Sequence, residues 1–198
     1  MSRSRVVLGT LCSALLVAIV APPLSAHVTP NVQLLKKGRF IGRSLSSASQ
    51  FFERHLKLDA ADRATLEKEA GWVPSSDDTK IYTGRSKSGA LVGTAIFLWM
   101  PSEHGPVGVA VAFDPRGKIL DAAVTDVGSE PLAWVQPLID AGGLSVYRGL
   151  ADGAVPDPAK IAPSVKGRMS RYYAMVIAGA VARAQALEKL SRKVSAGQ

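Results

Sequence analysis

The longest regular pattern of apolar positions lies toward the C-terminal end of the chain. From about Met169 or Ser170 to about Lys193, apolar residues recur every three or four positions, which is typical of an amphipathic helix. One predicted face carries Tyr173, Val176, Ile177, Ala180, Ala184 and Leu187, and the opposite side carries Arg171, Ala178, Gln185 and Arg192. Because Arg183 interrupts a short apolar middle, we expect this helix to pack on a sheet and not to span a membrane.

The middle of the chain consists of strand-like runs separated by turn residues. Apolar and small residues alternate over 107–114, and the "PRGK" that follows places Pro115 and Gly117 where a tight turn needs them. The pattern predicts an antiparallel sheet of about four strands, over 80–84, 90–99, 107–114 and 119–127.

Two helices are predicted ahead of this sheet. Segment 44–58 begins with serines that can cap a helix, and its apolar side would consist of Phe51, Phe52 and Leu56. A second helix follows Asp59, a good N-cap, and Gly71 is placed to end it. Residues 27–44 have no strong period, and we expect them to wrap loosely over the domain.

The region after the sheet contains several helix breakers. A short helix is predicted over 131–143, interrupted at Pro137 and stopped by Gly142, and a short strand over 144–150, before a proline-rich loop. The whole pattern predicts an α+β fold. It would be a single domain with a twisted antiparallel sheet, two N-terminal helices and a long C-terminal helix packed on the sheet.

The beginning of the chain has the pattern of a secretory signal. "MSRSR" is basic, "VVLGTLCSALLVAIV" is apolar, and "PPLSA" supplies small residues before a plausible cut after Ala26. We therefore expect a periplasmic or otherwise exported protein, membrane-associated if the signal is kept. The predicted divisions are a signal peptide (1–26), an N-terminal extension with a helix (27–56), the main domain (57–193) and a tail (194–198).

Composition narrows the possible classes of function. The chain has 24 Lys and Arg against 16 Asp and Glu, and removal of the signal with Arg3 and Arg5 would leave 22 against 16, a net charge of +6. The only cysteine, Cys12, would leave with it, which excludes disulfides and cysteine-based metal or redox sites. Nucleic-acid binding would favour interleaved aromatic residues or a reading helix, and neither is found. The basic clusters are either a solvated surface or a site for an anionic ligand, acidic partner or lipid headgroup.

Several segments in order carry a resemblance to a known family. They are "LDAADRATLEKEAGW", "KIYTGRSKSGALVGTAIF", "EHGPVGVAVAFDPRGKILDAAVTD" and the glutamate of "VGSEPLAWV". Over about residues 57–190 the chain resembles the FMN-binding domain family, which occurs in electron-transfer subunits of ion-pumping oxidoreductases and in exported flavoproteins. In members with covalent flavin, a Ser-Gly-Ala-Thr signature opens the closing helix, and its threonine is esterified to the FMN phosphate.

The matching stretch here departs from that signature. Gly167 is kept, Arg168 stands for alanine and Met169 for threonine, and a thioether cannot form a phosphoester. Ser170 has a hydroxyl but lies about 100° further around the helix. One account is non-covalent FMN binding by the helix amides, Gly167 and the Arg168 guanidinium. The other is a decayed site in which Ser170 caps the helix and Met169 joins the core.

The resemblance also implies roles for residues in two loops. His104 and Gly105 would lie beside the isoalloxazine ring, and Glu130 could hydrogen-bond the flavin. The alternative is that His104 and Glu130 are solvated loop residues without a role. Trp99 and Trp134 could stack on a planar ligand or simply fill the core.

One metal-binding alternative stays open. A mature chain beginning at His27 could chelate copper through its amine and imidazole if His55 or His104 lay nearby. We otherwise predict no metal site and no catalytic residue.

The sequence therefore supports two hypotheses. The first is an exported FMN-binding-domain-like protein in extracytoplasmic electron transfer, with non-covalent FMN if any, serving redox partner proteins at the membrane. The second is a non-redox accessory or assembly module of a membrane-associated redox complex, which has lost flavin binding and docks through its basic surface. An electron-transfer or accessory role is favoured over a stand-alone enzyme, and no nucleic-acid partner is expected.

Overall fold

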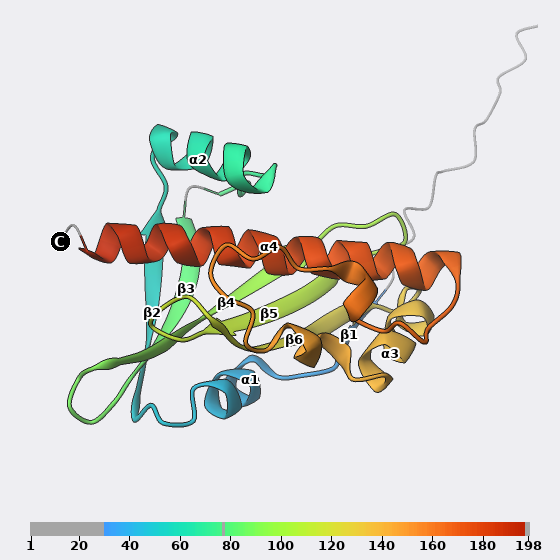
Figure 1. Ribbon diagram of the computed structural model, residues 1–198, viewed down its shortest axis with the longest axis horizontal. Coiled ribbons are helices and arrows are strands. Elements are labelled where there is room, and N and C mark those ends of the chain that lie inside the picture. Colours follow the sequence, from blue (N-terminus) through green and yellow to red (C-terminus); the bar gives the residue numbers. More distant parts are fainter. Residues whose placement is uncertain (1–29, 77, 197–198) are drawn as a thin grey trace, which may run out of the picture.

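The computed structural model describes residues 30–76 and 78–196 and shows a long helix, α4 (Arg168–Ala196), lying along one face of an antiparallel sheet (Figure 1). The six strands are arranged in the order β1-β6-β5-β4-β3-β2. Their bounds are β1 (Asn31–Gln33), β2 (Gln50–Lys57), β3 (Asp78–Arg85), β4 (Leu91–Met100), β5 (Val107–Phe113) and β6 (Ile119–Gly128). The predicted α+β fold, with its antiparallel sheet and long C-terminal helix, is confirmed.

Strand β2 lies in a segment, 44–58, for which a helix was predicted. That prediction is wrong: β2 pairs antiparallel with β3 along all eight of its residues. Phe51 and Phe52, which were to form the apolar side of a helix, remain 48% and 46% exposed. Neighbouring phenylalanines suit a pleated strand, and the ladder with β3 decides the outcome. With β1 at the other edge, the sheet has six strands in place of about four.

Two helices do precede β3, but the first lies earlier than predicted. Helix α1 (Lys37–Ser44) forms inside the segment that was expected to wrap loosely. It buries Phe40, Ile41 and the following Leu45 against small residues on the face of the sheet away from α4, namely Ala95, Ala110 and Ala112. The short helix has no side-chain cap, so the sequence carried little sign of it.

Helix α2 (Ala60–Ala70) confirms the predicted end signals. The carboxylate of Asp59 accepts a hydrogen bond from the Asp62 backbone N–H at 2.8 Å, and Asp62 accepts one from the Asp59 N–H. Gly71 ends the helix at φ 58°, a left-handed conformation that favours glycine.

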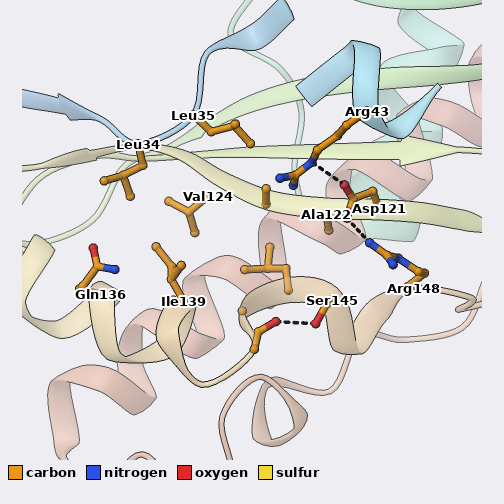
Figure 2. A pocket seen from close by; sticks show the side chains of 14 residues that line it. Leu34, Leu35, Arg43, Asp121, Ala122, Val124, Gln136, Ile139, Ser145 and Arg148 are labelled. Atoms are coloured by element: carbon orange, nitrogen blue, oxygen red, sulfur yellow. Dashed lines mark hydrogen bonds and ion pairs between the residues drawn. The ribbon is translucent and has the colours of Figure 1, made fainter. Parts of the chain in front are cut away.

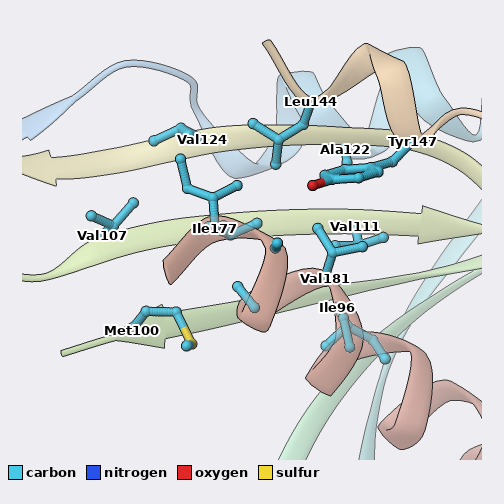
Figure 3. Packing of buried hydrophobic residues seen from close by; sticks show 14 of the residues in the cluster. Ile96, Met100, Val107, Val111, Ala122, Val124, Leu144, Tyr147, Ile177 and Val181 are labelled. Carbon is cyan, nitrogen blue, oxygen red and sulfur yellow. The ribbon is translucent and has the colours of Figure 1, made fainter. Parts of the chain in front are cut away.

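The main core lies between α4 and the sheet (Figure 3). Ile177 and Val181 of α4 pack there with Ile96, Val111 and Val124 of the strands. The predicted inner face of α4 is confirmed, but Ala178 and Gln185, predicted on the opposite side, are also buried. The segment between β6 and α4 covers this side of the helix. The side-chain amide of Gln185 donates to two carbonyl oxygens of that segment, those of Ala151 and Ala154, at 3.3 and 3.2 Å.

The region between β6 and α4 is helical and irregular. Its elements are α3 (Leu132–Asp140), η1 (Gly143–Tyr147) and η2 (Pro158–Lys160). Helix α3 runs through Pro137, and the strand predicted over 144–150 is wrong, because this segment forms the 3-10 turn η1. Only Gly149 and Leu150 bond in strand fashion, to the backbone of Ile119.

Candidate functional site

Three of the residues that the resemblance singled out lie together at one end of the sheet. Because β5 and β6 are antiparallel neighbours, the loop before β5 meets the loop after β6, and the Gly128 N–H donates to the Pro106 carbonyl. His104 Nδ1 lies 2.8 Å from Glu130 Oε1. Gly105, beside them, has φ 126°, which allows the loop to turn where a side chain would be strained.

Aromatic side chains complete this group. The Trp134 ring, from α3, lies 5.0 Å from the His104 ring and stacks on Tyr173 of α4 at 5.9 Å. The Tyr173 hydroxyl lies 3.0 Å from Ser102 Oγ, and burial raises the pKa of this phenol. We call His104, Glu130, Trp134, Tyr173 and Ser102 the aromatic cluster. Its polar atoms bond chiefly to one another: the His104 imidazole bonds the Glu130 carboxylate, and the Tyr173 hydroxyl bonds the Ser102 hydroxyl.

The start of α4 is built differently. The helix begins at Arg168, directly after an exposed Gly167 with φ 126° and open space around its α-carbon. Arg168 is exposed, Met169 is half-buried against the core, and Ser170 is buried in the first turn. The hypothesis that Ser170 is the N-cap is wrong, since the helix has already begun two residues earlier. Met169 does join the core, as the decayed-site account expected.

These two parts give different answers on whether FMN fits. At the start of α4, unpaired amide groups, a glycine and an exposed guanidinium suit a phosphate. At the aromatic cluster, His104 and Tyr173 already contact Trp134, so an isoalloxazine could stack there only by displacing one of them. Stacking of a flavin on Trp134 is therefore disfavoured in this arrangement, and no chemical step is assigned to a flavin.

Sequence reasoning found some members of this cluster and missed others. His104 and Glu130 came from the resemblance, and Trp134 was considered as a stacking residue. Tyr173 was assigned to the core only, and Ser102 was not considered. The signal in the sequence is the adjacent pair Tyr172 and Tyr173, five and six residues after Gly167. Both tyrosines contact the loop before β5, since Tyr172 accepts a hydrogen bond from the Glu103 N–H and Tyr173 bonds Ser102.

The remaining candidates lie elsewhere. Trp99 is exposed on the α1 side of the sheet and not in the core. His55 bonds Asp78 on the β2–β3 edge, away from the His104 loop in the topology of the sheet. The signal segment and His27 fall outside the described residues.

Two properties of the described residues concern membranes and metal ions. Across residues 30–76 and 78–196, none of the helices is both long enough and apolar enough to cross a bilayer. Within the same ranges, the side chains of His, Cys, Asp and Glu form no group of three or more arranged to hold a metal ion.

Comparison of the chain with protein-family models, curated proteins and solved structures gives no match. The resemblance to the FMN-binding domain family therefore stays a prediction from the quoted segments of the sequence.

Proposed function

We propose that this protein is a non-redox accessory or assembly module of a membrane-associated redox complex, with the architecture of an FMN-binding domain but without firmly bound flavin. The observation that carries this proposal is the filled aromatic cluster. His104, Trp134 and Tyr173 occupy one another's contact surfaces at the position where the resemblance would put the flavin ring.

Two surface features support a docking role. Strand β2 is an edge strand with Phe51 and Phe52 exposed, and in the described part of the chain no other strand pairs with its outer side. An open edge of this length with exposed aromatic residues is a ready surface for another protein. On α1, exposed basic residues form a cationic surface, consisting of Lys36, Lys37, Arg39 and Arg43. Acidic groups of a partner or of lipid would complement it.

A second candidate is a carrier of non-covalent FMN for extracytoplasmic electron transfer. The specific observation in its favour is the start of α4, where Gly167 leaves open space and Arg168 is exposed. A phosphate bound there would meet helix amides and a guanidinium, and a flavin held in this way would supply one- or two-electron chemistry.

Flavin titration separates the two candidates. The mature protein, purified from its native compartment, is examined for flavin absorbance and then titrated with FMN while the quenching of flavin fluorescence is followed. The accessory role predicts a colourless protein and no saturable quenching. A yellow protein, or saturable quenching that Arg168→Ala weakens, would instead establish the flavin carrier.

A complementation experiment tests the docking role directly. The gene is deleted in its host, and membrane-bound redox activity is compared after return of the wild type, of Arg168→Ala, or of the pair Phe51→Ser and Phe52→Ser. The proposal predicts that Arg168→Ala restores activity and that the β2 variant does not, although both fold. Restoration of the membrane-bound redox activity by the β2 variant would contradict the docking role.

A further inference from the structure

A pocket lies away from the aromatic cluster, beside the middle of β6 (Figure 2). It has a volume of about 660 Å³, within the range of small-molecule sites. One wall is the N-terminal segment that leads into α1, and the other is formed by α3 and η1. Strand β1 pairs only with Asp126–Gly128, so the part of β6 from Asp121 to Val124 lies open at the sheet edge between these walls.

One part of the pocket is apolar, and the rest of its lining is polar. Leu34 and Leu35 line it from the N-terminal segment, Val124 from β6, and Ile139 and Leu144 from the opposite wall. These side chains come from separate elements and are fixed by the packing of those elements. A ligand with an apolar body would therefore bury its surface in a largely preformed site.

One end of the pocket is charged, and a single buried carboxylate organises it. Asp121, whose side chain is 8% exposed, receives Arg43 Nε on Oδ2 at 3.0 Å and Arg148 Nη2 on Oδ1 at 3.1 Å. The Ser44 hydroxyl and the Ala122 N–H donate to the same two oxygens. All four donors fix the carboxylate and, through it, hold two guanidinium groups side by side.

Both arginines keep N–H groups that do not bond Asp121. Their side chains are 48% and 62% exposed, and each bonds Asp121 through one nitrogen of a group that has five N–H donors. Two positive charges and one negative charge leave this end with an excess of one positive charge. The Phe40 ring, 5.5 Å from the Arg43 guanidinium carbon, restrains Arg43 further.

The geometry points to a binding site for a small organic anion, one that joins an apolar body to a single carboxylate, sulfonate or phosphate group. The apolar body would lie between the leucine-lined walls, and the anionic group would bridge Arg43 and Arg148. The arginines are held together by Asp121 before any ligand arrives, so little ordering is required on binding. This site is separate from the aromatic cluster and from the start of α4, and it holds whichever function is proposed for them.

A pair of fluorescent dyes tests the inference. Anilinonaphthalene sulfonate combines an apolar ring system with one anionic group, and phenylnaphthylamine has the same rings without the charge. The whole mature protein is titrated with each dye at low and moderate salt. We expect saturable one-to-one binding of the sulfonate that weakens with salt, and weaker binding of the neutral dye.

Three variants assign the binding to this pocket. Arg148→Gln removes one guanidinium and should weaken sulfonate binding about tenfold, the value of one charged hydrogen bond. Ser145→Glu places a carboxylate at an exposed pocket position three residues before Arg148. This carboxylate would compete with the anionic dye for Arg148, while Asp121 and its partners are unchanged. The control Arg116→Gln makes the same charge change on an exposed turn outside the pocket.

The outcomes are distinguishable even if one variant is unstable. Circular dichroism first shows that each variant is folded, and Ser145→Glu stands in for Arg148→Gln if the latter is not. Equal sulfonate affinity in the wild type, Arg148→Gln and Ser145→Glu would overturn the inference. An equal loss in Arg116→Gln, or an equal loss for the neutral dye, would also overturn it, because neither depends on the arginine pair.

Discussion

The two ends of β6 carry two groups of polar side chains that differ in what surrounds them. After the end of the strand, Glu130 faces His104 in the aromatic cluster, where rings from α3 and α4 fill the space. Near the beginning of the strand, Asp121 faces Arg43 and Arg148 at the mouth of an open pocket. Functional types of residue converge at both ends, and a pocket of about 660 Å³ adjoins the Asp121 end.

The difference teaches that convergence of reactive side chains does not by itself define a site. In the aromatic cluster, His104 pairs with Glu130 and Tyr173 pairs with Ser102, and the rings of His104 and Tyr173 contact Trp134. In the pocket, the buried carboxylate is satisfied by four donors while the guanidinium groups keep donors for something else. Uncompensated charge next to an unfilled apolar cavity is the better sign of binding.

The largest effect that tests this comparison is expected for Asp121→Ala. Both arginines and Ser44 would lose their common acceptor, and we expect the free energy of unfolding to fall by about 3 kcal/mol. Urea denaturation measures it. The matched change at the other end, Glu130→Ala, removes the partner of His104 from an exposed pair and should cost less than about 1 kcal/mol. Equal losses in the two variants would remove the distinction between the two ends of β6.

A second buried carboxylate sharpens the interpretation of Asp121. Glu188 of α4 is 1% exposed, and Arg192 Nε lies 2.9 Å from its Oε2, while Arg192 also pairs with Asp152. Burial raises the pKa of Glu188 to about 7, against the opposing effect of Arg192. The negative charges of Asp152 and Asp114 act in the same direction as burial.

The sign of the pH effect follows from that raised pKa. Below the ordinary value of 4.5 the carboxyl is protonated in both the folded and the unfolded chain, and its stabilising contribution is fully present. As the pH rises toward 7 the unfolded chain loses its proton first, so stability falls by about 2–3 kcal/mol. Glu188→Gln should lack this loss in urea denaturation between pH 5 and pH 8. Parallel curves for the two proteins would contradict the raised pKa.

The sequence predicted the interior of the fold better than its edges. Alternation over 107–114 and the apolar face of α4 depend on burial, and both were found where the pattern placed them. Strand β2 and helix α1 were missed, because β2 is fixed by pairing with β3 and α1 by three residues that fit against small side chains. Such contacts join distant segments and leave no local period.

The candidate sites show the same division. His104 and Glu130 could be found because they lie in short loops of a resembling segment. The arginine pair could not, since Arg43 and Arg148 stand far apart in sequence. Arg43 was counted in a basic cluster that could be a solvated surface or a site for an anion, and Arg148 was not considered. They meet only because Asp121 lies on the exposed edge of β6 between α1 and η1.

A third prediction opens the filled end. His104→Ala removes the imidazole that contacts Trp134 and Glu130, which frees one side of the indole for a planar ring. Stacking on an aromatic side chain is worth about 1–3 kcal/mol, so FMN affinity measured by fluorescence quenching should rise about tenfold. The control His55→Ala removes another imidazole that bonds a carboxylate, Asp78, far along the sheet. Equal affinities in these two variants would show that His104 does not close the ring end.

The smallest expected effect concerns the hydroxyl of Tyr173. Burial raises its pKa, with the Ser102 hydroxyl acting in the opposite direction. The stabilising contribution of the neutral phenol is therefore present below pH 10, the ordinary value, and is lost as the pH rises through the higher value in the folded protein. Tyr173→Phe should remove one late step from an ultraviolet titration and cost about 1 kcal/mol near neutral pH.

Ser102→Ala is the companion variant, because it keeps the phenol and removes the hydroxyl 3.0 Å away. The late step should then move to higher pH still, since an interaction that favours the ionised phenol is gone. If the step that Tyr173→Phe removes lay near pH 10, or did not move in Ser102→Ala, the Tyr173 hydroxyl would not be held as described. In that case the aromatic cluster would be loose enough to admit a ligand, and its contrast with the pocket at the other end of β6 would disappear.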